Sequence, residues 1–197
     1  DSDRCSDVNL PHTVKELPLS YFSHQETAMI STYVKLLSVT SRMLENRIIL
    51  VFDGVMTYFE LFVNGQKAGE HKGGYSKSMF DITGLCKEGP NRIVLRVDSH
   101  EREDIPPFGY AIDYMTYGGI YRDVWLYCCS QVFVERALIR YDLEDKTVIL
   151  KPELFLDNNG PECSCTADIC LRDREGAVVS SYKRPVNAAP GRTSVTL

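Results

Sequence analysis

The chain has 197 residues and a mass of 22.3 kDa, enough for one large domain or two smaller ones without disulfide support. Its net charge is -5 and its 22 basic residues are dispersed, which excludes a nucleic-acid footprint and a patch for anionic membranes. The seven cysteines are odd in number and irregularly spaced, which favours free thiols in a reducing compartment, so we expect a cytoplasmic protein. No apolar run is long enough to span a bilayer, and no signal peptide is visible.

Apolar residues alternate with a period of two in one segment after another. In 92–98, Ile93, Leu95 and Val97 share one face, as in a half-buried strand. Comparable patterns predict strands at 33–39, 47–52, 58–63, 120–127, 132–139, 147–156, 164–171 and 177–182. No segment of ten residues has convincing helical periodicity. We therefore predict an all-β fold built from antiparallel sandwiches.

Turn signals separate these strands and place one domain boundary. Asn64-Gly65 is typical of a type I′ hairpin turn, and 88–91 reads Glu-Gly-Pro-Asn. Gly73-Gly74 is not a phosphate loop, because the lysine precedes the glycines and no Ser or Thr follows at the required position. We expect instead a tight bend between strands where a side chain would clash. The boundary falls near Ser130, which predicts a jelly roll over 1–130 and a second sandwich over 131–197.

The second predicted domain has only four or five expected strands. An immunoglobulin-like sandwich typically has about seven strands in about 100 residues. We therefore expect 131–197 to be an immunoglobulin-like domain cut short at its C-terminus, with 193–197 as an edge strand.

Residues suited to metal binding are scattered along the sequence. His12, His24, His71 and His100 show no ligand spacing, and Cys163 and Cys165 are too close in sequence to wrap a zinc ion in the usual way. We expect no metal site in this chain and no cofactor. Buried or half-buried free thiols are the favoured reading of the cysteines.

Several motifs occur together in a particular order. They are Leu-Pro-His at 10–12, Asp-Gly-Val at 53–55, Asn-Gly at 64–65, His-Lys-Gly-Gly-Tyr at 71–75 and Gly-Gly-Ile-Tyr-Arg-Asp-Val-Trp-Leu at 118–126. Together they resemble the galactose-binding-like jelly roll, the sugar-binding domain that opens enzymes of glycoside hydrolase family 2. This family includes bacterial β-galactosidases and β-glucuronidases. One departure is Ile-Ser-Thr-Tyr-Val-Lys at 30–35, where many members carry Gly-Trp-Tyr-Arg.

The resemblance implies that the chain is the noncatalytic front of a larger retaining glycosidase. The Gly-Gly-Ile-Tyr-Arg form at 118–122 favours a β-galactosidase that hydrolyses terminal nonreducing β-D-galactose residues. A β-glucuronidase, a β-mannosidase, a stand-alone carbohydrate-binding module and a purely structural domain stay as alternatives. The resemblance also implies a downstream barrel domain, a homo-oligomeric parent and magnesium or sodium ions in that parent.

Catalysis by such an enzyme needs two carboxyl groups that flank the scissile bond. The family's acid/base Glu follows an Asn in the barrel, and this chain has no Asn-Glu dipeptide, so we assign no catalytic residue to it. The resemblance places Asp113 where family members carry an aspartate that hydrogen-bonds a hydroxyl of the nonreducing sugar and helps hold sodium in some galactosidases. The alternative for Asp113 is a turn aspartate that caps backbone amides.

Other candidates near Asp113 are weaker. Arg122 lies in a predicted strand, so we expect it to make a structural ion pair or hydrogen bonds instead of binding substrate. Four aromatic residues could line a sugar cleft or cover an interface with the barrel: Phe108, Tyr110, Tyr114 and Tyr117.

Overall fold

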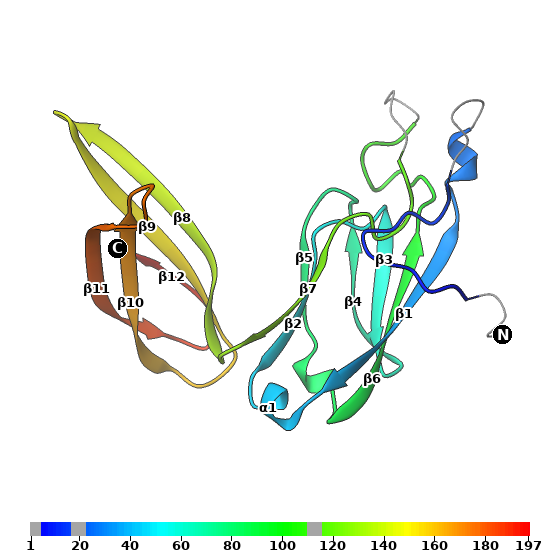
Figure 1. Ribbon diagram of the computed structural model, residues 1–197, viewed down its shortest axis with the longest axis horizontal. Helices are drawn as coiled ribbons and strands as arrows, with labels where there is room; N and C mark the ends of the chain where they lie inside the picture. The colour runs from blue at the N-terminus through cyan, green and yellow to red at the C-terminus, as the bar shows by residue number, and fades with distance from the viewer. Residues whose placement is uncertain (1–4, 17–22, 110–115) are drawn as a thin grey trace. The chain divides into compact units, whose positions relative to one another are not determined.

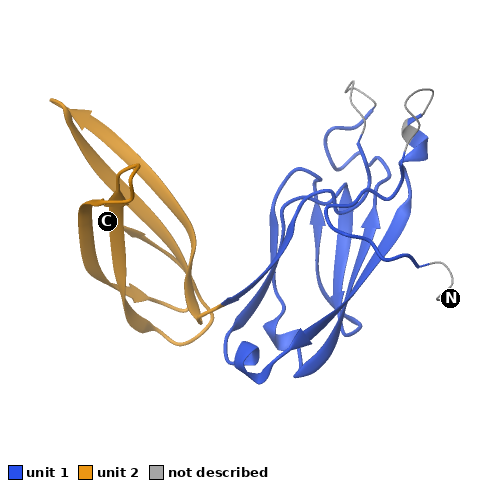
Figure 2. Ribbon diagram, viewed as in Figure 1, with its two compact units in different colours: residues 1–128 blue, residues 129–197 orange. Residues whose placement is uncertain are grey.

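The computed structural model describes residues 5–16, 23–109 and 116–197 (Figure 1). The chain forms two compact units, residues 1–128 and 129–197 (Figure 2). Both units are built from antiparallel strands, so the predicted all-β fold class is confirmed. In the described part of the chain, no helix has the length and apolar character needed to cross a bilayer.

Unit 1 is a sandwich of two antiparallel sheets, in the order β1-β6-β3-β4 and β5-β2-β7. Its short helical turns are η2 (His24–Glu26), α1 (Ser41–Leu44) and η3 (Thr83–Leu85). The strands are β1 (Ile30–Val39), β2 (Arg47–Phe52), β3 (Tyr58–Val63), β4 (Gln66–Lys72), β5 (Ser78–Asp81), β6 (Gly89–Asp98) and β7 (Val124–Cys129).

The core of unit 1 lies between these two sheets. Alternate residues of β3 and β6 point inward, which is the period-two pattern read from the sequence. Phe59 on β3 has no exposed surface, and its ring packs against those of Phe52 at 5.1 Å and Phe80 at 5.7 Å between centroids. Every residue of β2 is buried, so this strand is covered on both faces.

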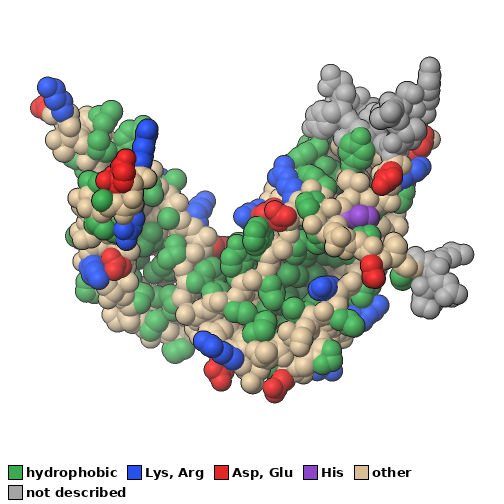
Figure 3. Space-filling model, in the orientation of Figure 1, with side chains coloured by type: hydrophobic (Ala, Val, Ile, Leu, Met, Phe, Trp, Pro, Cys, Tyr) green, Lys and Arg blue, Asp and Glu red, His purple; other side chains and the backbone are tan. Residues whose placement is uncertain are grey.

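An open groove of about 410 Å³ lies in unit 1, and strands β1 and β7 both contribute to its lining. Its lining is largely apolar and includes Leu37, Leu50, Phe52 and Leu126. Figure 3 shows hydrophobic side chains gathered on the visible face of unit 1.

Two predicted turns are confirmed by backbone geometry. Asn64 and Gly65 join β3 to β4 with φ values of 52° and 84°, the positive pair that a type I′ turn requires. Gly73 has φ 111°, and a Cβ added at Gly74 would lie 2.4 Å from the sulfur of Met56. The glycine pair therefore makes a tight bend that side chains would obstruct.

Three sequence predictions in unit 1 were wrong in detail. Strands β4 and β5 were missed, because β4 is mostly exposed and β5 has only four residues. The strand predicted at 120–127 begins only at Val124, since Gly119 has φ 121° and residues 118–120 bond to His12, Val14 and Met56. The turn predicted at 88–91 is largely strand, because β6 already begins at Gly89.

Asn91 stabilises the start of β6, and all the hydrogen-bonding groups of its side-chain amide have partners. It has no exposed surface. Its Oδ1 accepts hydrogen bonds from Lys87 N and Asn64 Nδ2, both at 2.8 Å. Its Nδ2 donates to the carbonyl oxygens of Lys87 at 2.7 Å and Gly89 at 2.9 Å. Removing this side chain would leave buried polar groups without partners.

We therefore expect Asn91→Ala to lower the free energy of unfolding by about 2–3 kcal/mol. Urea denaturation of the chain measures this loss. The matched control is Asn9→Ala, because Asn9 is exposed, and it should stay within about 0.5 kcal/mol of the parent chain. Equal stability of the two variants would contradict the role assigned to Asn91.

Unit 2 consists of a three-stranded sheet in the order β12-β9-β8 and a β10-β11 hairpin. Its small core contains Leu156, Ala167, Val186 and Ala188. An open apolar cleft of about 590 Å³ is lined by residues such as Val148, Leu150 and Tyr182. All seven cysteines of the chain are free. The strands are β8 (Val132–Glu144), β9 (Thr147–Asn158), β10 (Cys163–Arg172), β11 (Val178–Ala188) and β12 (Gly191–Thr196).

Candidate functional site

The candidate site is the end of unit 1 where β1 and β3 begin and β4 and β6 end (Figure 1). Loops from separate parts of the sequence meet there around a small recess of about 60 Å³. The recess carries both polar and apolar side chains, but its volume is far below the roughly 300–1,000 Å³ of a pocket that encloses a ligand. It is lined by Thr27, Ala28, Met56, Thr57, Gly74, Tyr75, Ser99, Glu101, Arg102, Ile105, Pro106, Pro107 and Thr116.

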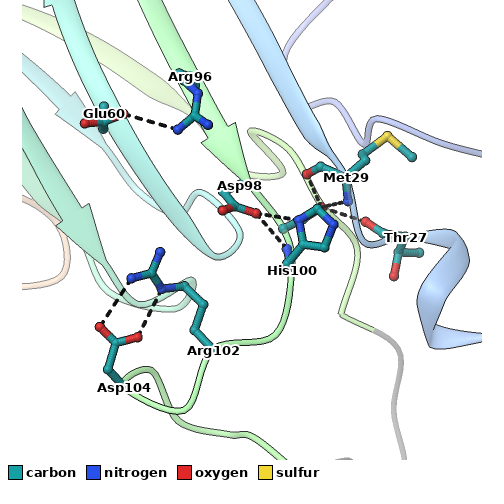
Figure 4. A network of polar contacts seen from close by, with 9 residues as sticks. Thr27, Met29, Glu60, Arg96, Asp98, His100, Arg102 and Asp104 are labelled. Atoms are coloured by element: carbon teal, nitrogen blue, oxygen red, sulfur yellow. Dashed lines mark hydrogen bonds and ion pairs between the residues drawn. The ribbon is translucent and has the colours of Figure 1, made fainter.

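Ser99 lines the recess and bonds to the segment before β1, near Thr27 and Met29 (Figure 4). Its hydroxyl donates to the carbonyl oxygen of Thr27 at 2.6 Å and accepts a hydrogen bond from Met29 N at 3.0 Å. Both Ser99 and Thr27 are buried. A Cβ added at Gly118 would lie 2.5 Å from the Ser99 side chain, so this glycine permits the close packing.

Asp98 organises the first residues after β6. Its Oδ1 accepts hydrogen bonds from the backbone N of His100 at 3.1 Å and from the ring Nδ1 of His100 at 2.7 Å. Burial raises the pKa of Asp98, but the hydrogen bonds from His100 outweigh this and hold the pKa below its usual value. The carboxylate therefore stays ionised at neutral pH. Its hydrogen bonds with His100 hold the turn that follows β6.

Arg102 and Asp104 bond to each other in the loop after β6 (Figure 4), and each also contacts a strand of the sheet. Arg102 Nε donates to Asp104 Oδ1 at 3.0 Å, and the Arg102 guanidinium lies 4.7 Å from the Tyr58 ring centroid. Lys72 at the end of β4 forms an ion pair with the same aspartate. These hydrogen bonds, first from Arg102 and then from Lys72, lower the pKa of Asp104 strongly. The stretch 99–109 is thus held at several points.

Asp113, the one substrate-binding residue assigned from the sequence, lies outside the described residues, as do Tyr110 and Tyr114. Its role therefore stays a prediction. Phe108 and Tyr117, which flank that segment, are 49% and 42% exposed, so both present aromatic surface at this end of the unit.

Arg122 makes hydrogen bonds of the kind predicted for a structural role, although it lies just before β7 and not within a strand. Its Nη1 lies 3.4 Å from the carbonyl oxygen of Asp53 and 3.5 Å from that of Tyr75, and it donates to both. The guanidinium also lies 5.3 Å from the ring centroid of Tyr121, whose hydroxyl donates to the carbonyl oxygen of Gly74. Arg122 therefore joins the loop after β2 to the loop after β4.

Sequence reasoning missed the residues that hold this end together. Ser99, Arg102 and Asp104 lie in a stretch without apolar alternation, and nothing local in the sequence signals their partners. Within the described ranges, no group of three or more His, Cys, Asp or Glu side chains is placed to hold a metal ion.

Comparison with known proteins identifies the family. Residues 7–130 match the family model described as glycosyl hydrolases family 2, sugar binding domain. The chain belongs to glycoside hydrolase family 2. The match covers the whole described loop end of unit 1, including the recess and the stretch 99–109.

Known relatives of this family 2 chain include proteins with two different names. A β-galactosidase from Thermoanaerobacterium thermosulfurigenes is 36% identical over 176 residues, which cover 87% of this chain and 25% of that protein. A β-glucuronidase from Bacteroides fragilis is 38% identical over 120 residues, or 60% of this chain and 17% of that protein. The crystal structure of a putative β-galactosidase from Bacteroides fragilis superposes with a TM-score of 0.85 at 27% identity, covering 96% of this chain and 30% of that one. The chain thus spans less than a third of the length of these proteins.

Proposed function

We propose that this chain is the noncatalytic front of a retaining β-galactosidase and that Asp113 contributes a substrate-binding carboxylate to the active site of the parent enzyme. The observation that carries the proposal is the 36% identity to a β-galactosidase over 87% of the chain. The motif at 118–122 supports the same sugar. A β-glucuronidase is the second candidate, because this chain is also 38% identical to a protein of that name over a shorter stretch of 120 residues.

The proposed role of Asp113 follows from carboxylate chemistry. An ionised carboxylate accepts strong hydrogen bonds from sugar hydroxyls, and adjacent hydroxyls can occupy both of its oxygens. The parent's barrel would supply the nucleophile and the acid/base carboxyl about 5 to 5.5 Å apart. Binding energy at the nonreducing sugar would then orient the scissile bond between them. The anchored stretch 99–109 supports a role for this end of unit 1.

The wider proposal concerns the parent protein. We infer a cytoplasmic homo-oligomer, in keeping with the free cysteines and the family resemblance. The resemblance also implies magnesium or sodium ions in the parent. Since the described residues contain no ligand cluster, we derive no step through a metal.

The test is kinetic and uses the full-length parent with aryl β-galactoside and aryl β-glucuronide. We expect Asp113→Ala to lower kcat/KM on the galactoside about 100-fold, equivalent to roughly 2.7 kcal/mol of transition-state stabilisation. The control is Asp7→Ala, an exposed aspartate far from this loop in sequence, which should leave the rate unchanged. A rate unaffected by Asp113→Ala would make Asp113 a turn residue, and preference for the glucuronide would favour the second candidate.

A further inference from the structure

Trp125 is the single tryptophan of the chain, and 47% of its surface is exposed. It lies on β7, where Val124 packs against the core. Because successive side chains of a strand point to opposite faces, Trp125 and Tyr127 share the outer face of the β5-β2-β7 sheet. Tyr127 is 50% exposed. Two large aromatic side chains therefore stand next to each other on a surface that the core does not use.

The indole ring is held in place by a polar bond at its edge. Trp125 Nε1 donates to Asp53 Oδ2 at 2.8 Å. Asp53 follows β2, and its Oδ1 forms an ion pair at 2.9 Å with Lys77 Nζ, which precedes β5. The Lys77 ammonium, followed by the Trp125 indole N–H, holds the pKa of Asp53 below its usual value. The acceptor thus stays ionised, and the ring is oriented before any ligand arrives.

Asp53, which binds the edge of the indole, also binds two basic side chains. The Lys77 side chain is 60% exposed, so its ammonium keeps hydrogen-bonding capacity beyond the ion pair. Arg122 Nη1 donates to the backbone carbonyl oxygen of Asp53 at 3.4 Å. An exposed, preoriented indole beside a carboxylate and an ammonium matches the two surfaces of a pyranose, its C–H face and its hydroxyl edge.

The two exposed rings match a small ligand in size. An aromatic side chain offers about 150–250 Å² of contact surface, whereas a stable protein interface needs roughly 800 Å² per partner. Trp125 also lines the apolar groove to which β1 and β7 contribute, so apolar surface continues beside the rings. Rigid aromatic surfaces bind small ligands at low entropic cost, because their orientation is already set.

We propose that Trp125, Asp53 and Lys77 form a saccharide-contact site on the outer face of the β5-β2-β7 sheet, built from residues other than Asp113. Trp125 supplies the stacking surface, and Lys77 donates to a sugar hydroxyl. Asp53 orients the Trp125 indole and the Lys77 ammonium through its two carboxylate oxygens. This site does not depend on the sugar that the parent hydrolyses.

The experiment uses the emission of Trp125, which is unambiguous because the chain has one tryptophan. The 197-residue chain is titrated with lactose and, separately, with cellobiose. We expect a saturable shift of the emission with at least one of them. Lys77→Met should weaken the apparent affinity at least fivefold, whereas Lys87→Met, which changes another exposed lysine of unit 1, should leave it unchanged.

Asp113→Ala separates this site from the proposed active-site residue. If the proposal is correct, the emission shift persists in that variant. Absence of a saturable shift with both saccharides, or an affinity unaffected by Lys77→Met, would overturn the proposal. A shift abolished by Asp113→Ala but kept in Lys77→Met would also overturn it, and would assign the bound saccharide to the other site. The kinetic test of the parent enzyme is independent of each result.

Discussion

Phe59→Ala is expected to lower the free energy of unfolding by about 3–5 kcal/mol, since it removes the central ring of the unit 1 core. Phe59 has no exposed surface, and its ring contacts Phe52 and Phe80 from the opposite sheet. The strands around it are paired on both sides, so the cavity cannot collapse easily. Urea denaturation followed by Trp125 emission measures the loss, because Trp125 lies in the same unit.

The matched control for this substitution is Phe108→Ala. Phe108 is 49% exposed, so removal of its ring should change the free energy of unfolding by no more than about 0.5 kcal/mol. If both variants lost the same stability, the core assigned to unit 1 would be wrong.

Gly119→Ala is expected to cost about 3 kcal/mol or more. Gly119 has φ 121°, a conformation that alanine adopts only with strain. A Cβ there would also lie 2.6 Å from the Tyr33 hydroxyl and 2.8 Å from the carbonyl oxygen of His12. The His12 carbonyl is backbone, and the adjacent His12 N–H already donates to the carbonyl oxygen of Ile120 at 2.7 Å. The segment around His12 can therefore move away from an added Cβ only if the hydrogen bond between His12 and Ile120 breaks.

Thermal or urea unfolding measures this second loss, with Gly84→Ala as its control. Gly84 lies in η3, its φ is not positive, and an added Cβ meets no heavy atom within 4 Å. We expect that control to be neutral or to stabilise by about 0.5 kcal/mol. A Gly119→Ala variant as stable as the control would show that the N-terminal segment does not pack against Gly119 in solution.

Much of the fold was predictable because burial in this protein follows strand periodicity. β3 and β6 alternate between core and surface, so their apolar residues mark the strands directly. The exposed β4 and the four-residue β5 carry no such signal, and they are found only through the strands they pair with. The strand predicted at 120–127 begins only at Val124, and the positive φ of Gly119 just before it is a conformational feature that residue hydrophobicity does not express.

The site was less predictable for a related reason. The structural role of Arg122 and the bend at Gly73-Gly74 follow from local residue chemistry. The bonds from Ser99 to Thr27 and from Trp125 to Asp53 each join residues 72 positions apart, and no local pattern reports them. The assignment of Asp113 came from family resemblance alone.

The hydroxyl of Ser99 has a consequence for how unit 1 fluctuates. Its bonds to Thr27 and Met29 connect the start of β1 to the end of β6, two neighbouring strands of one sheet. Local opening of a protein involves contiguous groups that separate together. Opening of the base of the recess therefore requires these hydrogen bonds between the ends of β1 and β6 to break together.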